Sequence, residues 1–206
     1  MITINTHNLG KRFNREWIFR NISKEFTSGR TYAITGANGS GKSTLLQILG
    51  GSTLLSEGTI EYMLSDKLLQ QPAVYQYISL TAPYLEVIEE MTLLEFFDFH
   101  SSLKPWICGI SSMDIIAATG LESAAAKQIR YFSSGMKQRV KLAQAIFSRS
   151  PIVLLDEPCT NLDDPGVNLY HSLIQKYREG RLLIIASNDK VEYDFCDEVI
   201  ELKKIG

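Results

Sequence analysis

The sequence predicts an α/β protein with a mainly parallel sheet flanked by helices, an N-terminal antiparallel β subdomain and an inserted helical subdomain. Short apolar segments alternate with amphipathic helical segments along most of the chain, a pattern typical of a sheet covered on both faces. Residues 1–35 are rich in strand-forming residues, whereas residues 85–135 are mainly helical. A chain of 206 residues suffices for one such domain. We therefore expect a single domain over 1–206, with the helical subdomain at about 85–135.

The predicted strands are short runs of β-branched, aromatic and aliphatic residues. Ile2, Ile4 and Thr6 alternate with polar residues, and a turn at Ser28-Gly29 precedes the third strand. The apolar runs in the C-terminal half have the length and composition of buried strands. The full set of predicted strands is 2–6, 17–26, 31–35, 57–62, 74–80, 152–155, 181–186 and 198–202.

The predicted helices carry apolar residues at spacings of three and four. Thr92 with Glu95 three residues later indicates a capping box, and Gly50-Gly51 ends an earlier helix. An Ala-rich stretch suggests one further turn of helix. The full set of predicted helices is 44–49, 91–103, 113–118, 124–129, 137–148, 167–177 and 189–195.

The composition is that of an ordinary globular protein. The net charge is −2, which gives no support for a strongly basic nucleic-acid binder. No apolar run approaches the roughly 18–20 residues that a membrane-spanning helix needs, and the N-terminus lacks the basic and apolar regions of a signal peptide. The three cysteines are scattered and have no metal-ligand spacing, which favours a reducing cytosol.

A glycine-rich loop between a predicted strand and a predicted helix is the most specific feature of the chain. Its glycines allow backbone N–H groups to surround an anion, and the following helix adds its positive end. Lys42 can reach the β- and γ-phosphates of a nucleotide, and the Ser43 hydroxyl suits Mg²⁺. The sequence therefore predicts a P-loop NTPase rather than an ordinary glycine-rich turn. The phosphate-binding candidates are Gly36, Ala37, Asn38, Gly39, Ser40, Gly41, Lys42, Ser43 and Thr44.

Two acids follow the apolar strand at 152–155. Asp156 lies where α/β folds bind ligands, at the carboxyl end of a strand, and would contribute to the Mg²⁺ shell. Glu157 is one residue further, points differently and could polarise an attacking water. The alternative is that these are two solvated acids at an ordinary strand end. The presence of the phosphate loop in the same chain favours the Mg²⁺ interpretation.

A third candidate stands at the start of the helix at 137–148. The segment 132–136 contains Ser133 and Gly135, and a helix N-terminus of this composition can bind an anion. An ordinary serine N-cap explains the same residues, and the physical argument alone favours that alternative. The position of the segment, directly before the helix that leads to Asp156, makes an anion site more plausible.

In these features the chain resembles the nucleotide-binding subunit of ABC transporters over essentially its whole length. The loop 36–43 matches the family's Walker A loop, 152–156 its Walker B strand, and Glu157 its catalytic glutamate. The segment 132–136 is similar to its Leu-Ser-Gly-Gly-Gln signature, and 159–163 to the D-loop that touches the partner. Phe13 falls where the family has an aromatic residue stacked on adenine, a role for which Trp17 is the second choice.

The resemblance implies Mg²⁺-dependent hydrolysis of ATP. Two copies, or one copy and a homologous subunit, would form a head-to-tail dimer around two ATP molecules, so Ser133 and Gly135 would serve the partner's nucleotide. The helical subdomain would dock on a separate transmembrane permease, which makes the protein cytoplasmic and peripheral on the inner face of the cell membrane. The transported substrate and the direction of transport stay open.

Two positions depart from the family's pattern. Pro83 stands where an ungapped alignment places the family's glutamine, and Asn188 replaces a histidine that contacts the γ-phosphate. Asparagine can bind phosphate but cannot carry a proton near neutral pH, so we expect Asn188 to take part in a site whose hydrolysis is slow. A nucleotide-gated clamp acting on DNA or ribosomes is the alternative. Relatives of that kind carry coiled coils or a second Walker A loop, which this sequence lacks, so we expect no direct nucleic-acid partner.

Overall fold

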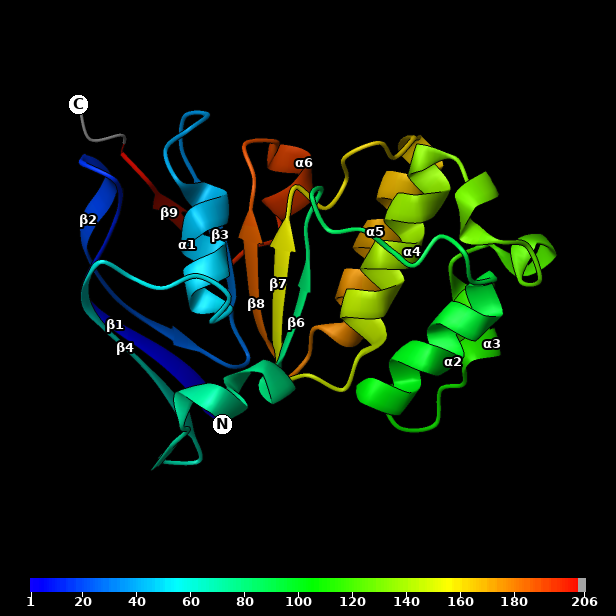
Figure 1. Cartoon of the computed structure of the whole chain (residues 1–206), viewed down its shortest axis with the longest axis horizontal. Coiled ribbons are helices and arrows are strands. Elements are labelled where there is room, and N and C mark those ends of the chain that lie inside the picture. The colour runs from blue at the N-terminus through cyan, green and yellow to red at the C-terminus, as the bar shows by residue number, and fades with distance from the viewer. Residues whose placement is uncertain (204–206) are drawn as a thin grey trace.

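The computed structural model describes residues 1–203, and for Gln71 and Pro72 the backbone only. Two sheets and a group of helices succeed one another across the molecule (Figure 1). The last three residues of the predicted domain lie outside the described part of the chain. The α/β class with its two additional parts is as the sequence predicts.

The N-terminal sheet is antiparallel and has the order β2-β1-β4-β5. The tight turn at Asn14, with φ 54°, connects its two longest strands, and asparagine tolerates that left-handed conformation better than most residues. The predicted antiparallel β subdomain is therefore confirmed, with strands that extend further than predicted. They are β1 (Ile2–Phe13), β2 (Glu16–Thr27), β4 (Glu57–Leu64) and β5 (Lys67–Leu68).

The second sheet has five parallel strands in the order β6-β7-β8-β3-β9. Every residue of β7 and β8 is buried, as expected where helices cover both faces of a parallel sheet. The five strands are β3 (Thr31–Thr35), β6 (Ile78–Thr81), β7 (Ile152–Asp156), β8 (Leu182–Ala186) and β9 (Glu198–Glu201).

Alternate residues of the parallel strands belong to two hydrophobic cores. Ile152 and Leu154 pack with helix α1 (Lys42–Leu49) and the N-terminal sheet. Val153 and Leu155 pack with α4, α5 and the helical subdomain on the other face. Figure 1 shows α1 on one side of the central strands and α4 and α5 on the other. The two long helices are α4 (Ser134–Phe147) and α5 (Asp164–Tyr177).

The helical subdomain lies at the end of the molecule away from the N-terminal sheet (Figure 1). Its first helix begins with the predicted capping box: the Glu95 N–H donates to the Thr92 hydroxyl, and Glu95 Oε2 accepts from the Thr92 N–H at 2.8 Å. The limits 85–135 for this subdomain stay a prediction. Its elements are α2 (Leu93–Leu103), α3 (Ser112–Ala118) and the 3-10 turns η2 (Glu122–Ala124) and η3 (Ile129–Tyr131).

One predicted element is partly wrong and another is absent. The strand at 74–80 is shorter, because η1 (Gln71–Tyr77) is a 3-10 helix and only β6 is extended; alternation over so few residues does not separate the two states. The helix at 124–129 does not form. There the Ile129 N–H donates to the Met91 carbonyl at 3.0 Å, and Gln128 forms an isolated antiparallel β-bridge with Thr92. This pairing with a distant segment overrides the helix preference of alanine. The short helix α6 (Lys190–Tyr193) precedes β9.

Candidate nucleotide-binding site

Three neighbouring strands end at the same edge of the parallel sheet, and the candidate residues follow them. The phosphate loop follows β3, Glu157 follows β7, and Asn188 follows β8 by two residues. Backbone hydrogen bonds join these ends: the Glu157 N–H donates to the Ala186 carbonyl at 2.9 Å, and the Ser187 N–H to that of Ile34 at 3.1 Å. The carboxyl edge of a parallel sheet is where α/β folds bind ligands.

The loop 36–41 needs glycine at both ends. Gly36 has φ 140° and Gly41 has φ 96°, conformations that other residues adopt at a cost. A side chain at Gly36 would collide with the Leu202 carbonyl, and one at Gly41 with the Ile18 side chain on β2. The loop is thus packed tightly against the N-terminal sheet and against Leu202, which follows β9. Gly39, at its crown, faces open space.

Lys42 and the loop enclose a cavity of about 320 Å³. The Lys42 side chain is largely buried, and its Nζ donates to the Gly36 carbonyl at 2.9 Å. The Ser40 hydroxyl is wholly buried and finds no hydrogen-bond partner among the described residues. The loop therefore places a cationic side chain at a concave space, and its glycine-rich backbone supplies N–H groups of the kind that bind anions. The cavity is lined by Ile18, Asn38, Gly39, Gly41, Lys42, Ser43, Thr44 and Glu157.

Asp156 and Ser43 form the candidate metal site. The Ser43 hydroxyl lies near the Asp156 carboxyl and lowers its pKa, but burial has the larger effect and raises that pKa to about 6. Oδ1 of Asp156 is buried and, within residues 1–203, accepts no hydrogen bond. A carboxylate with a free buried oxygen beside a hydroxyl is a donor set that fits Mg²⁺, which is usually bound by one or two carboxylates together with phosphate oxygens.

Glu157 has a backbone conformation unlike that of the strand before it. Its φ is 43°, in the left-handed region that costs a non-glycine residue about 1–3 kcal/mol. This turn directs Glu157 into the phosphate cavity, whereas Asp156 stays buried. Glu157 also lines an adjoining cavity of about 300 Å³. This geometry agrees with the expectation that the side chains of Asp156 and Glu157 point in different directions. The chemical roles of the two acids stay predictions.

Asn188 contacts the phosphate loop at two points. Its Oδ1 accepts from the Gly36 N–H at 3.2 Å, and its Nδ2 donates to Oδ1 of Asn38 at 3.0 Å. It also lines the adjoining cavity together with Glu157 and Asn38. The structure thus brings Asn188 to the phosphate loop, as we expected from the sequence. Its hydrogen bonds to Gly36 and Asn38 were not part of that expectation.

The segment after β6 presents a residue that the sequence analysis missed. The carbonyls of Ala82 and Pro83 accept hydrogen bonds from Lys141 Nζ, both at 3.3 Å. The next side chain, Tyr84, lies beside Gln47 and close enough to Asp156 to feel its charge, and burial raises the pKa of Tyr84. An ungapped count to Pro83 could not reveal this, because it compares positions along the chain and not the distances between side chains.

Phe13 lies at the end of β1 and is 50% exposed. Lys11 Nζ is 4.6 Å from the centre of its ring, and Ile18 rather than Phe13 lines the phosphate cavity. The Trp17 ring is covered by the Arg20 guanidinium at 4.1 Å. An exposed ring can receive a base, so the role of Phe13 stays a prediction.

Ser133 and Gly135 are part of a different cavity, of about 540 Å³. Ser133 caps α4, its hydroxyl accepting from the Met136 N–H at 3.2 Å, so the serine cap that the sequence left open is present. Asn161 and Asp163 from the loop after β7 line this cavity as well. The two cavities have different lining residues, and the signature segment therefore belongs to another surface of the chain than the phosphate loop.

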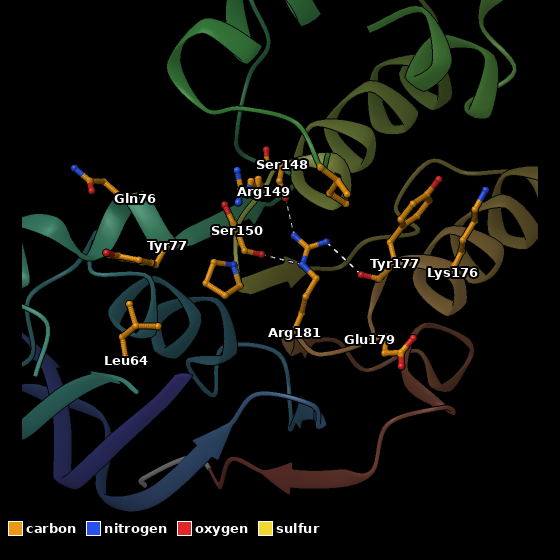
Figure 2. A pocket seen from close by; sticks show the side chains of 12 residues that line it. Leu64, Gln76, Tyr77, Ser148, Arg149, Ser150, Lys176, Tyr177, Glu179 and Arg181 are labelled. Atoms are coloured by element: carbon orange, nitrogen blue, oxygen red, sulfur yellow. Dashed lines mark hydrogen bonds between the residues drawn. The ribbon is translucent and has the colours of Figure 1, made fainter. Parts of the chain in front are cut away.

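Another cavity, of about 670 Å³, is at the opposite edge of the sheet, next to the amino ends of β7 and β8. Figure 2 shows that Arg181 extends across it. The guanidinium donates to the carbonyls of Ser150 at 2.8 Å and Ser148 at 2.9 Å. Arg181 therefore stabilises the backbone between α4 and β7. This cavity contains none of the candidate site residues.

The comparisons with known proteins agree with this arrangement. The family model described as ABC transporter matches residues 19–160. The chain belongs to this family. Among curated ABC proteins, an uncharacterized ABC transporter ATP-binding protein, YybJ of Bacillus subtilis (strain 168), is 36% identical over 203 residues, covering 95% of this chain and 90% of the relative. A putative hemin import ATP-binding protein, HrtA of Staphylococcus aureus (strain Newman), is 29% identical over 95% of this chain and 93% of the relative.

Solved ABC structures share the fold. A dimeric ATP-binding cassette in a post-hydrolysis state, bound to ADP and Pi, has a TM-score of 0.83 at 24% identity and covers 97% of this chain and 94% of that chain. A bacterial Atm1-family ABC exporter with ATP bound has a TM-score of 0.81 at 20% identity, over 98% of this chain and 37% of that chain. This protein is thus an ATP-binding subunit of an ABC transporter and an ABC-type ATPase. Within residues 1–203, none of its helices has the length and hydropathy to cross a membrane.

Proposed function

We propose that two copies of this chain, or one copy and a homologous subunit, bind two ATP molecules between them and hydrolyse them to drive a transmembrane permease. One observation carries this proposal. The phosphate loop with its acids and the segment with Ser133 and Gly135 line separate cavities of the same chain. A nucleotide in the first cavity would then be covered by the segment with Ser133 and Gly135 of another molecule.

The phosphate loop would hold the ATP phosphates. Its backbone N–H groups and the start of α1 attract negative charge. Lys42 would exchange the Gly36 carbonyl, which it contacts at 2.9 Å, for phosphate oxygens. A mobile lysine side chain would lose conformational entropy when the nucleotide binds. Lys42 already lies along the loop, so the entropic cost of nucleotide binding is lower.

Ser43 and Asp156 would bind Mg²⁺ through the hydroxyl and the free carboxylate oxygen. When bound, the ion would neutralise charge on the β- and γ-phosphates. Asp156 is buried, and this burial, with a smaller contribution from the charge of Glu157, keeps the pKa of its carboxyl raised. A cation would make its ionised form favourable.

Glu157 would orient and deprotonate the attacking water. Its carboxylate extends into the phosphate cavity, and it is the exposed member of the acidic pair. A carboxylate in this place can accept the water's proton as the water oxygen bonds to the γ-phosphorus and the bond from that phosphorus to the ADP oxygen breaks. Asn188, which borders the same region, would contact the γ-phosphate as a hydrogen-bond donor.

The location at the inner face of the cell membrane belongs to the same proposal. Both curated relatives are ATP-binding proteins by name, and such subunits act beside a permease. The helical subdomain has exposed apolar residues suited to contact another protein, among them Phe99 at 42% and Leu103 at 70% exposed.

A mixing experiment tests the shared site. Lys42→Ala disables the phosphate loop, and Ser133→Asp places a negative charge in the signature segment while keeping an N-cap acceptor for α4. Each variant alone should lose at least nine tenths of its ATPase activity. A mixture should regain activity, because the mixed dimer has one site built from an intact loop and an intact signature. No recovery, with both variants folded and mixed dimers demonstrated by mass, would refute the shared site.

A further inference from the structure

Glu192 is a buried carboxylate that the proposed function does not use. It lies on α6 and is 4% exposed. Its Oε1 accepts a hydrogen bond from the Cys159 N–H at 2.6 Å. Its Oε2 is buried and has no hydrogen-bond partner in the part of the chain that the structure describes. Burying a carboxylate is costly, and one backbone N–H could be satisfied by a neutral side chain.

The group that Glu192 holds begins the loop 159–163. Cys159 stands two residues after Glu157, and the Thr160 N–H donates to the Glu157 carbonyl at 3.1 Å. Further along, the Asn161 carbonyl lies 3.0 Å from where a Cβ on Gly135 would be. The loop therefore runs from the acid in the phosphate cavity to the cavity of the signature segment. A shift at Cys159 would move both ends.

The helix that carries Glu192 begins two residues after Asn188, at Lys190. Asp189 caps α6 by accepting from the Val191 N–H at 3.0 Å. The other side of the helix is fixed to α5, where the Tyr170 hydroxyl donates to the Glu192 carbonyl at 2.7 Å. The adjoining cavity of about 300 Å³ is lined by Asn188, Glu192 and Cys159 together. Glu192 thus lies between the residue that contacts the phosphate loop and the loop 159–163.

We propose that Glu192 is a positioning residue that couples the segment after β8 to the loop 159–163. Movement of Asn188 when nucleotide enters the phosphate loop is transmitted through α6 and the Glu192 carboxylate to Cys159. The loop then presents Asn161 and Asp163 correctly at the signature cavity. The inference rests on the proposed function insofar as that cavity receives the second nucleotide.

Hydrogen exchange measures this coupling without depending on catalysis. We would record it in the Ser133→Asp background, so that a second copy does not cover the loop 159–163. ATP should slow amide exchange at 36–44 and, at least threefold, at 159–163. With Glu192→Ala added, protection at 36–44 should persist and the response at 159–163 should disappear. Equal responses of both segments in the two proteins would overturn the proposal.

Two variants separate positioning from simple stability. Glu192→Gln keeps an acceptor oxygen for the Cys159 N–H and should restore the response of the loop and kcat to within threefold of wild type. Glu192→Ala should lower kcat at least tenfold while the Kd for ATP changes less than threefold. Tyr170→Phe, which removes the other hydrogen bond of the same residue, should lower Tm and leave the response of the loop unchanged.

If Glu192→Ala does not fold, Glu192→Asp serves instead. It keeps the charge but is one methylene too short to reach Cys159, so basal exchange at that amide should accelerate and the response to ATP should be lost. A wild-type response in Glu192→Asp would overturn the proposal. Failure of the proposed function is distinguishable, because it would appear in the mixing experiment with Glu192 unchanged.

Discussion

Asn188 donates a hydrogen bond from its Nδ2 to Oδ1 of Asn38 over 3.0 Å, so a residue beyond β8 holds the crown of the phosphate loop. The same side chain accepts from the Gly36 N–H at the beginning of the loop, at 3.2 Å. One amide group thus fixes two points of a loop whose glycines would otherwise allow many conformations. A loop that is ordered before the ligand arrives loses less entropy on binding.

Asn188→Ala should therefore weaken ATP binding by up to about thirtyfold, because it removes two hydrogen bonds that contribute about 1 kcal/mol each. Asn38→Ala should have a smaller effect, since the bond to Gly36 remains. The double variant should lose less than the sum of the two, because they share one bond. Fluorescence titration with an ATP analogue measures all three. Strictly additive losses would show that the Asn188–Asn38 contact has no part in binding.

Asn188→His tests whether this residue limits the rate. A histidine offers a proton-carrying group near the γ-phosphate but gives up the amide that braces the loop. If the departure from the family's histidine slows hydrolysis, steady-state kcat should rise at least twofold while ATP binding weakens. An unchanged or lower kcat would place the limiting step elsewhere.

Glu157→Gln should lower kcat at least tenfold, which corresponds to about 1.4 kcal/mol of activation free energy. Glutamine has nearly the same shape but cannot accept the water's proton. ATP affinity should change little, because the phosphates are held by the loop. Glu25→Gln is the matched control, an exposed position on β2 outside the site. Wild-type turnover in Glu157→Gln would remove Glu157 as the catalytic base.

The sequence was informative where local chemistry dictates the structure. The phosphate loop needs glycines whatever surrounds it, and the capping box at Thr92 was predictable because both of its partners lie within four residues. The apolar strands β7 and β8 were also found at nearly their true limits. Helix α4 begins three residues before the predicted start, because Ser133 is itself the cap.

Contacts between distant segments could not be read from the sequence. The pairing of Ile129 with Met91, which prevents the predicted Ala-rich helix, joins residues nearly forty positions apart in the chain. The approach of Tyr84 to Gln47 depends on how the segment after β6 turns. The bond from Glu192 to Cys159 spans 33 positions. A glutamate in a short helix has no signal that marks it as buried before the fold is known.

Phe13→Ala should weaken ATP binding about fivefold, because stacking of a base on an aromatic ring contributes about 1–3 kcal/mol. Phe13→Tyr should bind like wild type, since the ring is kept. Tyr75→Ala, which removes another exposed aromatic side chain outside the phosphate cavity, is the control. Comparison of ATP with inorganic triphosphate isolates the base, and only the affinity for ATP should fall. A larger loss in Trp17→Ala would assign the stacking to Trp17.

His100 should make the stability of the protein depend on pH. Gln144 donates to its Nδ1 at 3.0 Å, so the neutral ring carries its proton on Nε2 and donates to the Ser148 hydroxyl at 2.8 Å. Burial, with a contribution from Lys104, lowers the pKa of His100 to about 4. Below pH 6.5 the unfolded chain gains a proton there that the folded protein does not bind. Stability is thus complete above pH 6.5 and falls as the pH is lowered toward 4.

Urea unfolding at pH 7.5 and 4.5 measures this effect. The free energy of unfolding of the wild type should fall by about 2 kcal/mol more than that of His100→Gln over this interval, as the displaced pKa requires. His7→Gln, at an exposed position of β1, should keep the wild-type dependence. Identical pH dependence in His100→Gln and the wild type would mean that the ring accepts a proton without leaving its place between α2 and α4.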